Sequence, residues 1–142
     1  ESGLYPQAFE ERVRGARLRP GNAYAALSAA RIAAGIGRLG EAEDWYRLAA
    51  IYEPNGAIVL AESAAFLSKI GRVERARELL NVFELLQSTN LVAWESAWDA
   101  YQTLGALEKA DRAKDVLCQG QVLRVNLCEE LVVPFQLQRL GS

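Results

Sequence analysis

A short pattern, a glycine followed five residues later by an alanine, recurs at a constant interval along this chain of 142 residues. It reads GLYPQA, GRLGEA, GRVERA and GALEKA, beginning at Gly3, Gly37, Gly71 and Gly105. A fixed period of this length is typical of proteins in which one small structural unit stacks on copies of itself. The period therefore constrains the fold more than any other feature of the sequence.

Each unit contains two apolar stretches with the three- and four-residue spacing of an amphipathic helix. In the second stretch of two successive units the apolar residues are Ala42, Trp45, Tyr46, Ala49 and Ala50, and then Ala76, Leu79, Leu80, Phe83 and Leu86. Glycine ends a helix easily because it adopts the left-handed backbone conformation at little cost. We therefore expect helix breaks near Gly37, Pro54, Gly71, Ser88 and Gly105.

The same register predicts how the chain is divided. Residues 1–22 form half a repeat with only a second helix, Pro6–Arg19, and full repeats follow over residues 23–56, 57–90 and 91–123. Residues 124–142 do not follow the period and form a C-terminal cap or tail. This segment could open a short helix capped by Asn126, or it could be an extended tail on the last helices.

The alanines at positions 8, 42, 76 and 110 fit a close contact between two antiparallel helices joined by a short turn. With the small residues Ala30 and Ala64, the aromatic Tyr46 and the closing Pro54, this 34-residue pattern resembles the tetratricopeptide repeat family. The resemblance covers Gly3 to about Leu123. It implies an all-α fold, a right-handed superhelical solenoid of antiparallel helix hairpins.

Repeat three departs from the family pattern. Trp98 occupies a position where the family prefers a small residue, and Leu117 replaces an alanine. A large ring at a close helix contact forces a wider crossing or a local exchange of large for small side chains, which Ala97 and Ala100 could supply. We therefore expect repeat three to be packed less regularly than repeats one and two.

The resemblance implies that the first helix of each repeat lines a concave groove that binds a protein or peptide. The predicted partner-binding residues are Tyr24, Leu27, Arg31, Ile58, Ala61, Ala65, Lys69, Val92, Glu95 and Asp99. For the apolar members, ordinary packing between helices explains the pattern as well as a groove does. The slots that clamp a partner's terminal carboxylate in some family members hold only one basic residue here, Arg31, so no such clamp is predicted.

Two function classes follow from this. The first is a scaffold that binds a partner helix or peptide in the groove, within a bacterial secretion, pilus or polysaccharide-export assembly. The second is a structural spacer or self-association segment of a longer array. RNA binding by related 35-residue repeats is disfavoured by the period of 34 and the acidic balance.

The N-terminal half repeat raises a separate expectation. The apolar residues Ala8, Phe9 and Val13 lack a hairpin partner, so the half repeat is either a piece of a longer array or the pairing surface of a protomer. Large apolar patches are rarely left in water. We therefore expect a homodimer through this open end, or poor solubility of the isolated chain.

Composition argues against several other functions. The chain has no histidine, which removes the commonest general base and metal ligand, so we predict no enzyme, no metal site and no cofactor. A net charge of −2 does not favour nucleic acid, and no apolar run approaches the ~20 residues of a membrane span. The sequence does not decide between a cytoplasmic and a periplasmic location.

The two cysteines, Cys118 and Cys128, fit neither a redox pair nor a zinc ligand set. We interpret each as a small, buried apolar residue. A disulfide between them is the alternative, and it would require an oxidising compartment.

Overall fold

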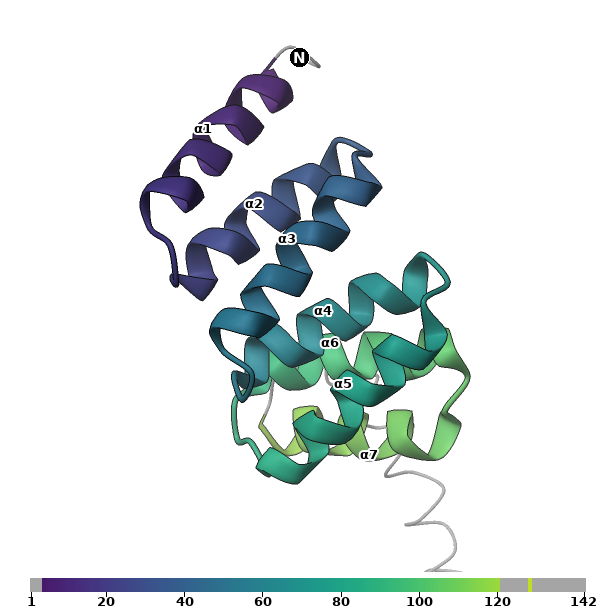
Figure 1. Cartoon of the computed structure of the whole chain (residues 1–142). Coiled ribbons are helices and arrows are strands. Elements are labelled where there is room, and N and C mark those ends of the chain that lie inside the picture. Colours follow the sequence, from purple (N-terminus) through teal and green to yellow (C-terminus); the bar gives the residue numbers. More distant parts are fainter. Residues whose placement is uncertain (1–3, 121–127, 129–142) are drawn as a thin grey trace, which may run out of the picture.

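The computed structural model describes residues 4–120 and residue 128 of the chain (Figure 1). Within those residues the fold is all-α and contains no strand. Its helices are α1 (Leu4–Leu18), α2 (Ala23–Gly35), α3 (Leu39–Tyr52), α4 (Ala57–Lys69), α5 (Val73–Leu86), α6 (Leu91–Leu104) and α7 (Leu107–Gln119). The predicted seven helices between Pro6 and Leu123 are confirmed as far as Gly120, and the expected cap or tail at 124–142 lies outside the described residues apart from Cys128.

The period of the sequence appears directly in the helix boundaries. The helices α2, α4 and α6 begin at residues 23, 57 and 91, and α3, α5 and α7 begin at residues 39, 73 and 107. Both series advance by the same interval as the glycine-alanine pattern. The predicted helix breaks are confirmed as well, because each turn near Gly37, Pro54, Gly71, Ser88 and Gly105 separates two helices.

The turn inside each hairpin has the same geometry three times. Gly37, Gly71 and Gly105 have φ values of 83°, 85° and 74°, which side chains other than glycine rarely adopt. The residue after each glycine donates its N–H to a carbonyl in the last turn of the preceding helix, as in the bond from Arg38 to Ala33 at 2.9 Å. The glycines therefore recur because each closes a helix with a left-handed turn.

The starts of the first helices repeat less strictly than their ends. The Asn22 side chain accepts a hydrogen bond from the Ala25 N–H at 3.0 Å, and Asn90 does the same for Ala93. The equivalent residue of the middle repeat is Gly56, which has no side chain to cap α4. The first helices of repeats one and three thus have a capping interaction that the middle one lacks.

Alanine allows the helices of each hairpin to pack closely. Ala42 and Ala76 are fully buried and Ala110 is nearly so, at the positions predicted from the glycine-alanine pattern. The pairs α2 with α3, α4 with α5, and α6 with α7 pack along each other as antiparallel neighbours (Figure 1). This arrangement agrees with one unpaired helix followed by three hairpins.

The junctions between successive hairpins differ. Helix α4 packs extensively against α6, but it makes far less backbone contact with α2 and meets the first hairpin mainly through α3. Repeat three was expected to pack less regularly because of Trp98, yet its first helix makes the more extensive junction. Ala97 and Ala100 are fully buried beside Trp98, while Trp98 itself is only half-buried.

Between residues 7 and 18, most of the exposed positions of α1 are polar or charged. Phe9 is buried within the same chain with 3% of its surface exposed, and Ala8 and Val13 are partly buried. The exposed positions between residues 7 and 18 are Gln7, Glu10, Glu11, Arg12, Arg14, Arg17 and Leu18. Phe9, which was expected to lie in a bare apolar stripe, is therefore covered within the chain. The homodimer through this end stays a prediction.

Candidate protein-binding surface

The ten predicted groove residues fall into two groups. Leu27, Ala61 and Ala65 are buried, with 0%, 0% and 7% of their surface exposed. These three residues pack between helices and are not available to a partner on the surface. The remaining residues are exposed or half-buried, and they are Tyr24, Arg31, Ile58, Lys69, Val92, Glu95 and Asp99.

Three apolar residues of the second group occupy the same position in successive first helices. Tyr24, Ile58 and Val92 each stand second in their helix and are separated from one another by one full period. Tyr24 is 61% exposed and Val92 is 57% exposed, whereas Ile58 is partly buried against the core. The period thus places an apolar side chain at the start of α2, α4 and α6, and this side chain is more than half exposed on α2 and α6 but not on α4.

A polar cluster links the first hairpin to α4. The Arg31 guanidinium of α2 donates two hydrogen bonds to the Glu62 carboxylate of α4, at 2.7 and 2.6 Å. The Tyr46 hydroxyl of α3 donates to the same carboxylate at 3.1 Å. The bond to Glu62 raises the pKa of Arg31, and burial together with Glu62 raises the pKa of Tyr46. Glu62 therefore connects three helices.

A single exposed ion pair accompanies the second junction. Lys69 at the end of α4 lies 2.7 Å from a carboxylate oxygen of Asp99 on α6. Both side chains are about half exposed, so the pair contributes little to stability. Arg31 is paired with Glu62 in the same way. Both cations that the sequence placed in the groove, Arg31 and Lys69, are therefore neutralised by acidic groups of the same surface.

A second tyrosine-carboxylate cluster lies between α5, α6 and α7. The Tyr101 hydroxyl donates to Glu84 at 2.9 Å, and Lys109 and Arg112 approach the same carboxylate at 3.5 and 3.8 Å. Burial and the bond to Glu84 raise the pKa of Tyr101. The sequence predicted neither the contacts of Glu62 nor those of Glu84, because they join residues of different helices at separations that the period does not specify.

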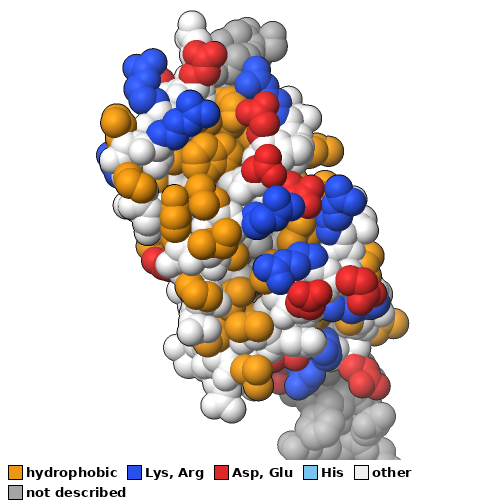
Figure 2. Space-filling model, in the orientation of Figure 1, with side chains coloured by type: hydrophobic (Ala, Val, Ile, Leu, Met, Phe, Trp, Pro, Cys, Tyr) orange, Lys and Arg blue, Asp and Glu red, His pale blue; other side chains and the backbone are white. Residues whose placement is uncertain are grey.

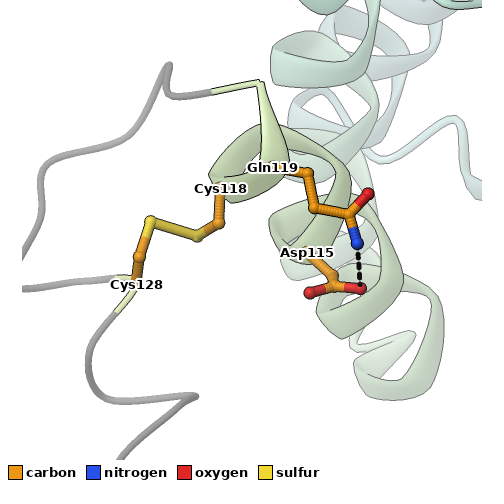
Figure 3. The surroundings of a disulfide bond; sticks show 4 residues. All are labelled: Asp115, Cys118, Gln119 and Cys128. Carbon is orange, nitrogen blue, oxygen red and sulfur yellow. Dashed lines mark hydrogen bonds between the residues drawn. A yellow bond between two sulfur atoms is a disulfide. The ribbon is translucent and has the colours of Figure 1, made fainter.

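Cys118 and Cys128 form a disulfide, with their Cα atoms 5.6 Å apart (Figure 3). Cys118 is in the last turn of α7 and is half-buried, so the interpretation of two buried, unpaired cysteines is wrong. The bond fixes residue 128 next to the end of the last described helix. The spacing of ten residues could not distinguish between the two alternatives.

No protein-family model matches the sequence, and a search of curated proteins found no match. Among residues 4–120 and 128, no group of three or more acidic or cysteine side chains could hold a metal ion. None of the helices in that part of the chain is long and apolar enough to cross a membrane.

Proposed function

We propose that this protein is a tetratricopeptide-like scaffold that binds a helix or peptide of a partner protein, and that it is not an enzyme. The helix boundaries support the repeat assignment because both helix series follow the period of the sequence. The proposed architecture is a right-handed superhelical solenoid, and the proposed binding surface is the side formed by α2, α4 and α6.

One observation carries the binding proposal. Tyr24 and Val92, at equivalent positions of α2 and α6, expose more than half of their surface although most large apolar residues of these helices are buried or half-buried. Exposed aromatic and aliphatic side chains at equivalent positions of two first helices favour a partner with an apolar stripe. The neighbouring charges are paired internally, so apolar contacts rather than the Arg31 and Lys69 charges would provide the affinity.

The experiment is site-specific photocrosslinking in the source cells. A photoreactive residue would replace Tyr24 or Val92 in the first helices, and Leu85 or Leu107 in the second helices. Leu85 and Leu107 are 82% and 71% exposed, which makes them controls of similar accessibility. We expect the same adduct from positions 24 and 92 and none from positions 85 and 107. Adducts from all four positions, or from none, would contradict a groove on the first helices.

The assembly to which such a scaffold would belong is proposed to be a bacterial secretion, pilus or polysaccharide-export system. A disulfide persists mainly in oxidising compartments, so its presence favours the periplasm over the cytoplasm. Thiol labelling of Cys118 and Cys128 in intact cells, with and without a reductant, tests the compartment. Labelling without reductant would place the working protein in a reducing compartment.

A further inference from the structure

Four arginines on and just after α1 differ from almost all other cations of the molecule. Among the residues that the structure describes, Arg31, Arg38, Arg47, Lys69, Arg72, Arg75, Arg77, Lys109 and Arg112 each form an ion pair. Within the same residues, Arg12, Arg14, Arg17, Arg19 and Lys114 do not. Four of these five cations without an ion pair therefore lie in the segment 12–19.

This segment makes one end of an acidic protein locally positive. Residues 4–22 contain four arginines and two glutamates, while the whole chain has a net charge of −2. Figure 2 shows lysine or arginine side chains around a hydrophobic area at the end of the molecule where α1 lies. A local concentration of positive charge that no acidic group of the described residues pairs with attracts anionic partners.

A hollow of about 490 Å³ lies between α1 and α3. Phe9, Val13, Leu18 and Trp45 supply its apolar surface, and Arg14 and Arg17 lie at it together with Glu10 and Glu41. The volume lies within the ~300–1,000 Å³ that ligand sites usually have. Leu18 is 76% exposed, so an apolar group can reach the hollow from solvent.

The neighbouring hollows between second helices lack this combination. The hollow between α3 and α5 has a volume of only about 30 Å³. The Glu43 carboxylate at this hollow forms ion pairs with Arg47 and Arg72. Between α5 and α7 the hollow measures about 440 Å³, but its cations Lys109 and Arg112 both face Glu84. Of these three hollows, the one beside α1 alone combines open apolar volume with unpaired arginines.

We propose that the hollow between α1 and α3 binds an acidic segment of a partner protein that carries one large apolar or aromatic side chain. The apolar side chain packs against Val13, Leu18 and Trp45, and flanking carboxylates pair with Arg14 and Arg17. Glu10 and Glu41 lie at the same hollow and repel negative charge, so binding requires carboxylates placed beside Arg14 and Arg17 together with the apolar side chain, a combination that a nucleic acid does not offer. This site uses no residue of the proposed groove, so the two proposals can fail separately.

The test uses the full chain and a fluorescent peptide in which one phenylalanine is flanked by runs of aspartate and glutamate. Fluorescence anisotropy measures its affinity for the wild type and for Arg14→Glu/Arg17→Glu. We expect the double reversal to weaken binding about tenfold or more, since it replaces attraction by repulsion on both sides of the hollow. Leu18→Asp, which changes an exposed residue of the hollow, should weaken binding several-fold.

The matched control is Arg77→Glu/Lys114→Glu, which changes the net charge by the same amount at two sites away from the hollow. We expect it to bind the peptide as the wild type does, and we expect a peptide with alanine in place of phenylalanine to bind much more weakly. Any of four results would overturn the proposal: no binding by the wild type, an equal loss in the control, equal binding of a lysine-rich peptide, or equal binding of a single-stranded oligonucleotide.

Discussion

Helices α4 and α6 lie against each other closely, whereas α2 and α4, which occupy the same places one repeat earlier, make little backbone contact. At the first junction, Arg31, Tyr46 and Glu62 connect three helices by hydrogen bonds, and the rings of Tyr46 and Phe66 lie 4.9 Å apart. At the second, buried alanines of α6 permit close approach, and Phe83 meets Trp94 edge-on at 4.9 Å. A constant sequence period is therefore compatible with two different ways of stacking.

The difference has a simple physical origin. A long side chain that bonds across a junction holds two helices apart, while alanine lets their backbones meet. Arg31 of α2 bonds to Glu62 of α4, and the residue equivalent to Arg31 in α4 is the buried Ala65. We expect the two junctions to respond differently to substitution, and the following predictions use that difference.

Removing an aromatic side chain from the second junction should have the largest effect. Phe83 is fully buried and packs on Trp94, so Phe83→Ala leaves a cavity and should lower the free energy of unfolding by about 3–5 kcal/mol. Urea denaturation measures it. Leu85→Ala, two residues away and 82% exposed, should change stability by less than about 0.5 kcal/mol. Similar losses in the two variants would mean that Phe83 is not a core residue of this junction.

The hairpins should resemble each other even though the junctions do not. Ala42 and Ala76 are both fully buried at the close contact within their hairpins. Replacing either by leucine should overpack the contact and cost about 1–3 kcal/mol. Thermal melting of Ala42→Leu and Ala76→Leu compares the two hairpins. If either variant melted at the wild-type temperature, its alanine would not be a contact residue.

Polar contacts should contribute measurably to the stability of the first junction and very little to that of the second. Glu62→Ala removes the acceptor of the buried Tyr46 hydroxyl and of Arg31, and should cost about 1–3 kcal/mol. Asp99→Ala breaks only the exposed pair with Lys69 and should cost about 0–1 kcal/mol. A double-mutant cycle with Arg31→Ala isolates the coupling to Glu62. Equal costs at Glu62 and Asp99 would remove the distinction between the junctions.

Alkaline pH should weaken both tyrosine clusters. Burial raises the pKa of Tyr46 and of Tyr101, and the carboxylates of Glu62 and Glu84 raise them further. Because an unfolded tyrosine titrates near ~10, their contribution to stability is complete below pH ~10 and is lost as pH rises toward the folded-state values. The slope is about 1.4 kcal/mol per pH unit for each tyrosine.

Denaturation by urea on either side of pH ~10 tests this titration. Tyr46→Phe and Tyr101→Phe should each flatten the alkaline slope by a similar amount, because the two hydroxyls have similar environments. If neither variant altered the slope, the loss of stability would come from other groups, and the tyrosine-carboxylate bonds would not be the cause.

The sequence predicted the parts of this fold that depend on neighbouring residues. Gly37, Gly71 and Gly105 ended helices where expected, because a left-handed turn is a local requirement. The groove residues were predicted less well: Leu27 and Ala61 are core residues, since a helical face alone does not tell whether the next hairpin covers it. Contacts between hairpins, such as that of Arg31 with Glu62, depend on how the units stack. The periodic pattern does not specify the stacking, so it could not predict these contacts.

The distance between equivalent residues of successive first helices tests the two-junction account most directly. Spin labels at positions 24 and 58 report on α2 and α4, and labels at positions 58 and 92 report on α4 and α6. We predict a clearly longer mean distance for the first pair, because α4 packs along α6 and not along α2. Equal distances would contradict the account, since they would mean that the sequence period fixes one uniform stacking along the whole array.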